Sequence, residues 1–89
     1  MSDYIGIVPV TFDEFGSGKV YLFECKPWKT IKEGEYVMVE EGKFAKAVAD
    51  VLSISTTSEN YKWIVQVSGA KHPLKRIVGR VMTIEYGED

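Results

Sequence analysis

The stretch Ile31–Ile54, IKEGEYVMVEEGKFAKAVADVLSI, decides the fold that we expect for this chain. Its first half, Glu35–Glu41, alternates between two faces, with Val37 and Val39 together on one of them, as in a half-buried β-strand. A glycine turn follows and leads into a second strand over Lys43–Ile54. A hairpin of this kind is typical of a small, strongly bent β-barrel, and such barrels usually bind a partner and rarely catalyse a reaction.

Small residues alternate along the second strand of this hairpin. Ala45, Ala47 and Ala49 would share one face, where they suit a bend in a barrel or the close approach of another backbone. A helix over Phe44–Ile54 is the alternative, because alanine favours helices. The hairpin turn at Glu41–Gly42, directly before this stretch, favours the strand.

The rest of the chain supplies four more predicted strands, which we place at Tyr4–Phe12, Val20–Lys26, Tyr61–Ser68 and Leu74–Tyr86. Pro9 has no N–H to donate, so it predicts an edge strand or a bulge. Gly79 predicts a kink or bulge in the last strand, and a short helical turn near Pro73–Ile77 is a further option. The predicted class is therefore all-β, with a small barrel of five to six antiparallel strands.

Length and composition limit what the chain can do. The 89 residues predict a single domain over residues 1–89, and an apolar fraction of 45% is enough for one compact core. The sequence shows neither an apolar run of about 18 residues nor a basic and apolar leader, so we expect no membrane span and no signal peptide. The single cysteine, Cys25, is expected as a half-buried strand residue of a reducing, cytoplasmic protein.

The charge is small and uneven along the chain. A net charge of −2 and a pI near 5.4 argue against a dedicated duplex binder, whose affinity comes mainly from neutralised phosphates. Residues 1–50 carry six cationic and nine acidic side chains, whereas residues 51–89 carry five and four. We therefore expect a local basic patch on an acidic body, formed by Lys71, Lys75, Arg76 and Arg80.

Catalytic and metal-binding motifs find little support. One cysteine and one histidine, Cys25 and His72, cannot form a zinc site on their own. A lone histidine without a nucleophile elbow also argues against a catalytic triad. Gly16–Lys19, GSGK, lacks the spacing of a phosphate-binding loop and is interpreted as a hairpin loop. We expect no enzyme activity, no metal and no cofactor.

Exposed aromatics and cations are the candidates for a binding surface. Trp28, in a loop beside Pro27 and Lys29, and Tyr36, on the polar face of its strand, could stack on the bases of single strands. Phosphate contacts are expected from the patch of Lys71, Lys75, Arg76 and Arg80. The alternatives are that Trp28 covers one end of the barrel and that the cations form an ordinary solvated surface.

The hairpin resembles KOW-type modules, the SH3-like barrels of NusG-type transcription factors and several ribosomal proteins. The family pattern of turn glycines, alternating valines and a last aliphatic residue is matched by Gly34, Glu35, Val37, Val39, Gly42, Phe44, Val51 and Ile54. Ala49 stands where that family has its characteristic glycine.

A longer stretch, Val20–Ile54, is similar in order and length to the N-terminal DNA-binding domain of the primosomal helicase PriA and to small phage proteins. Leu22 stands where that domain carries an acidic residue used against a DNA end. Both resemblances imply an SH3-like small barrel and a role in handling nucleic acids.

The sequence thus predicts a non-enzymatic, cytoplasmic binding module, which we expect to derive from a phage or another mobile element. It would act on single-stranded nucleic acid or on a protein complex that handles it. The alternative is a protein-interaction module, such as a virion or replisome component, in which an exposed strand edge, with the first strand as the candidate, pairs with another chain. Such an edge would also permit homo-oligomers, and we expect no contact with membranes.

Overall fold

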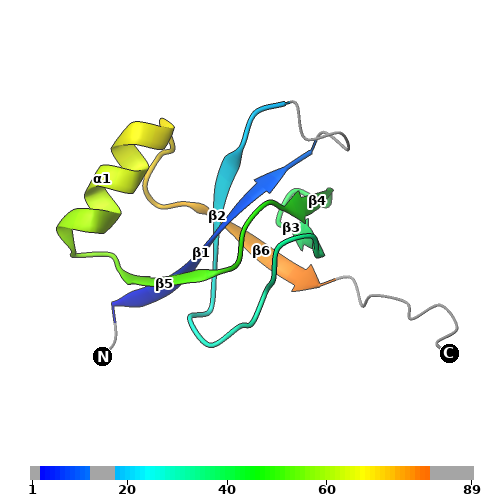
Figure 1. Ribbon diagram of the computed structural model, residues 1–89, viewed down its shortest axis with the longest axis horizontal. Coiled ribbons are helices and arrows are strands. Elements are labelled where there is room, and N and C mark those ends of the chain that lie inside the picture. Colours follow the sequence, from blue (N-terminus) through cyan, green and yellow to red (C-terminus); the bar gives the residue numbers. More distant parts are fainter. Residues whose placement is uncertain (1–2, 13–17, 81–89) are drawn as a thin grey trace, which may run out of the picture.

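The computed structural model describes residues 3–12 and 18–80 of the chain (Figure 1). Its elements are β1 (Tyr4–Thr11), β2 (Tyr21–Cys25), β3 (Tyr36–Val39), β4 (Phe44–Ala47), β5 (Leu52–Ser55), α1 (Glu59–Ser68) and β6 (Lys75–Arg80). The strands pair in the order β2-β6-β3-β4-β1, and a β1–β2 pairing closes this set into a small barrel, to which β5 adds alongside β1. The prediction of an all-β fold with a small barrel is confirmed.

The barrel core follows the alternation of the strands. Val37 and Val39 are fully buried while Tyr36 is exposed, as predicted for the hairpin. The buried side chains that fill the barrel are Val8, Val10, Phe23, Ile31, Val37, Val39, Ala45 and Ala47. Because eight buried side chains from four strands and one loop meet inside, the barrel has a filled interior.

One pairing departs from the predicted antiparallel barrel. The β2–β6 ladder is parallel, with Phe23 opposite Lys75 and Glu24 opposite Arg76. The physical reason lies in α1, which stands between β5 and β6 and carries the chain back so that β6 starts beside β2 and runs in the same direction (Figure 1). Antiparallel neighbours need only a short turn, whereas a parallel pair needs a crossover of this kind.

The predicted long strand over residues 43–54 is divided in two. Both parts, β4 and β5, pair with the same edge of β1, and the chain between them bends away from β3. At the bend, Val48 N–H donates to the Pro9 carbonyl (2.9 Å). Ala45 and Ala47 are buried but Ala49 is exposed, so the predicted alternation ends at this bend. The alternative of a helix is wrong.

The prediction that the first strand lies at an edge of the sheet is wrong as well. β1 pairs with β2 on one side and with β5 and then β4 on the other. Pro9 lies where the partner changes from β5 to β4, in a gap between two ladders, so its missing N–H removes no ladder hydrogen bond. Among the described strands, it is β5 that keeps an unpaired edge.

The strand predicted over Tyr61–Ser68 is helical instead. Ser58 caps α1 by accepting from Tyr61 N–H (3.1 Å), and Gly69 ends it with a positive φ of 75°. Tyr61, Ile64 and Val65 follow helical spacing and pack, with Ile7, Ile54 and Leu74, into a second cluster outside the barrel. The helical turn predicted near Pro73–Ile77 is absent from this described segment, which instead enters β6 at Lys75.

A bulge is found next to Gly79, where the sequence predicted one. Met38 pairs with Gly79 and Val39 with Ile77, which leaves Val78 as the extra residue in β6. The predicted continuation of this strand to Tyr86 lies outside the described residues. No helix among residues 3–12 and 18–80 is long and apolar enough to cross a membrane.

Candidate binding site at the mouth of the barrel

A groove of about 850 Å³ opens at one end of the barrel, which we call the mouth. Here β1 ends, β2 and β6 begin, and the β3–β4 turn bends back. The loop from α1 to β6 forms the remaining wall. The lining residues are Phe12, Lys19, Val20, Tyr21, Leu22, Phe23, Glu41, Lys43, Ser68, Gly69, Ala70, Lys71, His72, Pro73, Leu74 and Lys75. The mouths of barrels are a common place for ligand sites.

Aromatic rings form one part of the groove surface. Phe12 meets Tyr21 edge to face with centroids 5.5 Å apart, and it meets Phe23 in the same manner at 6.1 Å. Phe23 belongs to the barrel core, whereas Phe12 is 40% and Tyr21 45% exposed. The core therefore extends into the groove as a surface on which a flat, apolar ligand group can stack.

Four lysines line the same groove, which is unexpected in an acidic chain. Lys43 Nζ lies 5.8 Å from the centroid of the Phe12 ring, so a cation and an aromatic face adjoin. Lys19, Lys43 and Lys71 have no carboxylate partner among the described residues. The fourth, Lys75, pairs with Glu41, the single acid among the lining residues that the structure describes. Among the described lining residues, cations therefore outnumber acids by four to one.

The wall opposite the β1–β2 hairpin is held by α1. Tyr61 is buried, and its hydroxyl lies 2.6 Å from Nδ1 of His72, so the helix and the loop behind it are joined by a hydrogen bond. Burial and the charge of Glu24 raise the pKa of the Tyr61 phenol above its ordinary value. Leu74 packs with Tyr61 in the second apolar cluster and fixes the part of the loop that leads into β6. Lys71 thus stands on a wall with two fixed points.

The six residues predicted to contact nucleic acid do not form one surface. Lys71 and Lys75 line the groove. Arg76 lies on the outer wall, with its Nε 3.9 Å from Glu24 Oε2. The backbone N–H of Arg76 donates to Glu40 Oε1 (2.8 Å). The predicted continuous patch from Lys71 to Arg80 is therefore divided between the groove and other parts of the barrel.

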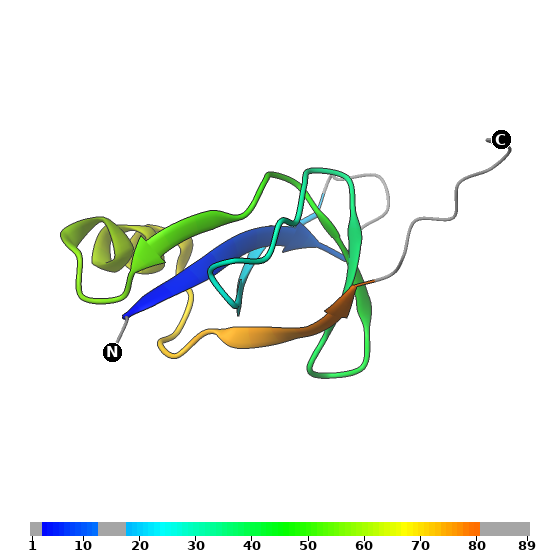
Figure 2. The ribbon, with the colours of Figure 1, turned by 90° about the horizontal axis from the view of Figure 1, so that it is seen from below.

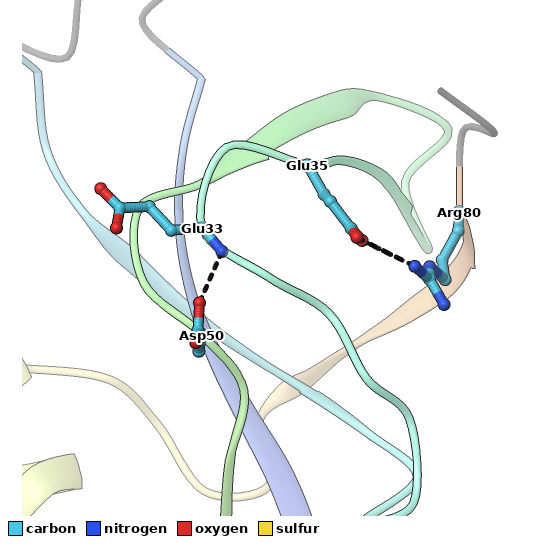
Figure 3. A network of polar contacts seen from close by, with 4 residues as sticks. All are labelled: Glu33, Glu35, Asp50 and Arg80. Carbon is cyan, nitrogen blue, oxygen red and sulfur yellow. Dashed lines mark hydrogen bonds and ion pairs between the residues drawn. The ribbon is translucent and has the colours of Figure 1, made fainter. Parts of the chain in front are cut away.

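Arg80 lies at the opposite end of the barrel, where β2 ends and β3 begins, which we call the far end. Its guanidinium contacts both carboxylate oxygens of Glu35, at 2.9 and 3.0 Å. Beside this pair, Glu33 N–H donates to Asp50 Oδ1 (2.8 Å), as Figure 3 shows. Acids thus outnumber the cation in this network, and Arg80 acts locally as a structural counter-ion.

The two predicted stacking residues lie outside the groove. Trp28 is 71% exposed in the loop after β2, with Lys26 Nζ 5.7 Å from its ring centroid. Tyr36 is 45% exposed on the outer wall of the barrel, opposite Lys46 in the β3–β4 ladder. Trp28 is thus the exposed aromatic that its loop position indicated, but neither side chain is among those that line the groove.

Sequence reasoning found Lys71 and Lys75 but missed the other lysines and the aromatic residues of this site. Phe12, Tyr21, Lys19 and Lys43 were assigned to strands and turns, and they meet only because the barrel closes between β1 and β2. The two aromatic residues close to a lysine in Lys19–Phe23 were the one local signal that could have indicated it.

Groups for other chemistry are scarce in the described part of the chain. Residues 3–12 and 18–80 contain no cluster of three or more histidine, cysteine or acidic side chains placed to hold a metal ion. Burial raises the pKa of the half-buried Cys25 thiol, which opposes formation of the reactive thiolate. What the groove offers is stacking surface and positive charge.

Comparisons with protein families, curated proteins and solved structures find no match for this chain. The groove and the barrel are therefore the basis on which a function can be inferred.

Proposed function

We propose that this protein is a non-enzymatic binding module that takes up single-stranded nucleic acid in the groove at the mouth of the barrel. The observation that carries the proposal is the union of exposed aromatic rings and four lysines in one concave surface of an acidic chain. Proteins that hold single strands combine aromatic rings for the bases with a positively charged groove for the backbone.

Each part of the groove has a role in this proposal. Tyr21 and Phe12 receive a base, because their rings are partly exposed and braced edge to face. Lys43, in the β3–β4 turn, and Lys71, in the loop after α1, contact the phosphates of the strand. The resemblances of Ile31–Ile54 to KOW-type modules and of Val20–Ile54 to the PriA domain agree with this role, since both families handle nucleic acids and a small closed barrel is compatible with their SH3-like fold.

A single strand fits the groove better than a duplex. Stacking on Tyr21 needs an unpaired base, and a chain with a net charge of −2 offers little of the phosphate neutralisation that duplex binding depends on. The sequence-derived candidates Trp28, Tyr36, Arg76 and Arg80 do not line the groove, and the proposal assigns them no contact with the strand.

The test is the fluorescence anisotropy of a labelled single strand of about 16 nucleotides, titrated with protein at several salt concentrations. The variant Lys43→Gln/Lys71→Gln should bind more weakly than the native protein. Its plot of log affinity against log salt should also be flatter by about 1.4, since each phosphate contact on a single strand contributes about 0.7. A label on the nucleic acid is needed because neither Trp28 nor Trp63 lines the groove.

The matched control is Lys32→Gln/Arg76→Gln, which removes the same charge from exposed positions outside the groove. It should leave the slope close to the native value. If the native protein binds but both double variants lose affinity equally, net charge governs binding and the groove assignment is wrong. If the native protein binds no single strand at low salt, the proposed function is wrong.

A second candidate function rests on the unpaired edge of β5. Thr56 N–H donates to Asp3 O (3.0 Å), and the alternation of an antiparallel ladder then turns the Ser53 N–H and C=O away from β1. Val51–Ser58 also contains no charge or proline to protect this edge. In this alternative the protein is an assembly module that pairs β5 with a strand of another chain and makes no contact with nucleic acid.

This candidate makes a separate prediction. Replacing Ser53 with lysine should place a charge at the edge and abolish any concentration-dependent increase in mass, measured by light scattering after gel filtration. A mass that stays monomeric over the whole concentration range of the native protein would exclude self-assembly. The edge offers few hydrogen bonds, because Val51 N–H already donates to Ile31 O and Ser55 O accepts from Ser58. We therefore favour the groove.

A further inference from the structure

The ion pair between Glu41 and Lys75 is not needed to hold together the two segments that carry these residues. Glu41 belongs to the β3–β4 turn and Lys75 begins β6, and these two segments are already joined by the backbone. Glu40 N–H donates to Arg76 O (2.9 Å), and Arg76 N–H donates to Glu40 Oε1 (2.8 Å). The side chains of Lys75 and Glu41 are 58% and 37% exposed, and an exposed pair of this kind adds little to stability.

Glu41 is also the one acid among the described lining residues, between two of the lysines. The hydrogen bond from Lys75, supported by the charges of Lys75 and Lys43, holds the pKa of the Glu41 carboxyl below its ordinary value. The pKa of Lys75 is raised by the same hydrogen bond. Both groups are thus charged near neutral pH, and the Glu41 carboxylate is the partner of Lys75 in the free protein.

We propose that Glu41 is an internal counter-ion that competes with the phosphates of the ligand for Lys75 and thereby limits the affinity of the groove. This inference rests on the proposed function and adds a regulating residue to it. In the free protein, Lys19, Lys43 and Lys71 form no salt bridge with any residue that the structure describes. A single strand gains the fourth contact only when a phosphate displaces the carboxylate, whose negative charge repels it.

The experiment replaces Glu41 with glutamine, which keeps the size of the side chain and removes its charge. Glu41→Gln should bind the labelled single strand roughly two- to fivefold more tightly than the native protein, as expected for release of one exposed ion pair. Its salt dependence should be steeper by about 0.7, because one more phosphate is neutralised. The double variant Glu41→Gln/Lys75→Gln should return both quantities to near the native values.

The control is Glu33→Gln, which changes the net charge equally at the far end of the barrel, where the contact of Glu33 with Asp50 is made by its backbone N–H (Figure 3). A gain in affinity equal to that of Glu41→Gln would assign the effect to net charge and overturn the proposal. So would an unchanged slope for Glu41→Gln, or weaker binding, which would make Glu41 a ligand contact. In those cases the native protein still binds and the proposed function stands. If neither the native protein nor any variant binds the strand, both the proposed function and the role of Glu41 are wrong.

Discussion

Tyr61 in α1 and His72 in the following loop face each other edge to face, with ring centroids 5.6 Å apart and a hydrogen bond between the Tyr61 hydroxyl and His72 Nδ1. This contact joins the second apolar cluster to the loop that forms a wall of the groove. The helix, which lies beside the barrel (Figure 2), therefore holds one wall of the groove in place.

Replacing Tyr61 with phenylalanine should test this relationship. Loss of the hydrogen bond should lower the free energy of unfolding by about 1 kcal/mol, measured by urea denaturation. Because the loop then loses one of its two fixed points, affinity for the labelled single strand should fall as well. A variant with lower stability but native affinity would show that the wall holds its shape without this hydrogen bond.

Tyr61 should also make the stability of the protein depend on pH in alkaline solution. The pKa of Tyr61 is raised in the folded state, so the folded protein keeps this proton more tightly than the unfolded chain does. Stability is then fully present below the ordinary tyrosine pKa of about 10 and falls as the pH rises above it. Urea denaturation at pH values on both sides of 10 should show a steeper loss for the native protein than for Tyr61→Phe.

Substitutions of Tyr21, which lines the groove, and of Trp28, which was predicted from the sequence, distinguish between two possible binding surfaces. Tyr21→Ala should lose about 1–3 kcal/mol of binding free energy, the usual value for one stacked base. Trp28→Ala should leave the affinity unchanged, although Trp28 is the more exposed side chain. The opposite result, with Trp28 essential and Tyr21 dispensable, would place the ligand at the far end of the barrel. Anisotropy at low salt decides between them.

The close approach of β1 to its neighbours predicts a strong effect at Gly6. A Cβ atom there would lie 2.8 Å from Cγ2 of Val51, 2.9 Å from Sγ of Cys25 and 3.2 Å from the Lys26 carbonyl oxygen. Gly6→Ala should therefore lower the free energy of unfolding by about 1–3 kcal/mol. Gly79→Ala is the matched control, because its Cβ would meet no atom within 4 Å. Equal effects of both substitutions in urea denaturation would contradict this explanation.

The start of α1 depends on Ser58. Its hydroxyl accepts from Tyr61 N–H and donates to the Ser55 carbonyl (2.7 Å), which joins β5 to the helix. Ser58→Ala should cost about 1 kcal/mol of stability, with a loss of helical signal in circular dichroism before the barrel unfolds. Ser53→Ala, at an exposed position in β5, should cost much less, and a similar cost at both positions would argue against a capping role.

The parts of the fold that could be predicted are those with a local cause. The β3–β4 hairpin shows its alternation in Val37 and Val39, and Gly42 has the positive φ of 84° that its turn needs. The segment Tyr61–Ser68 misled because its apolar residues fit both a period of two and helical spacing. The residues that favour the helix lie outside this segment, because Ser58 caps its start and Gly69 ends it.

The remaining differences arise from contacts between distant segments. The bend after Ala47 exists because β1 offers a second stretch of the same edge to β5. The groove needs the closure of β1 on β2 and the position of α1, which bring Phe12 next to Lys43. Lys71 and Lys75 were predicted as cations of a binding site, but no pattern along the chain indicates that Lys43 joins them.

The four lysines of the described groove lining belong to a chain with a net charge of −2. Cations are not confined to the mouth, because Lys26, Lys29 and Lys32 lie in the loop at the far end, where Arg80 pairs with Glu35 (Figure 3). If the proposed function holds, the net negative charge repels a polyanion at long range, and the lysines of the groove attract it only at short range. Encounters would then be slow at the outset.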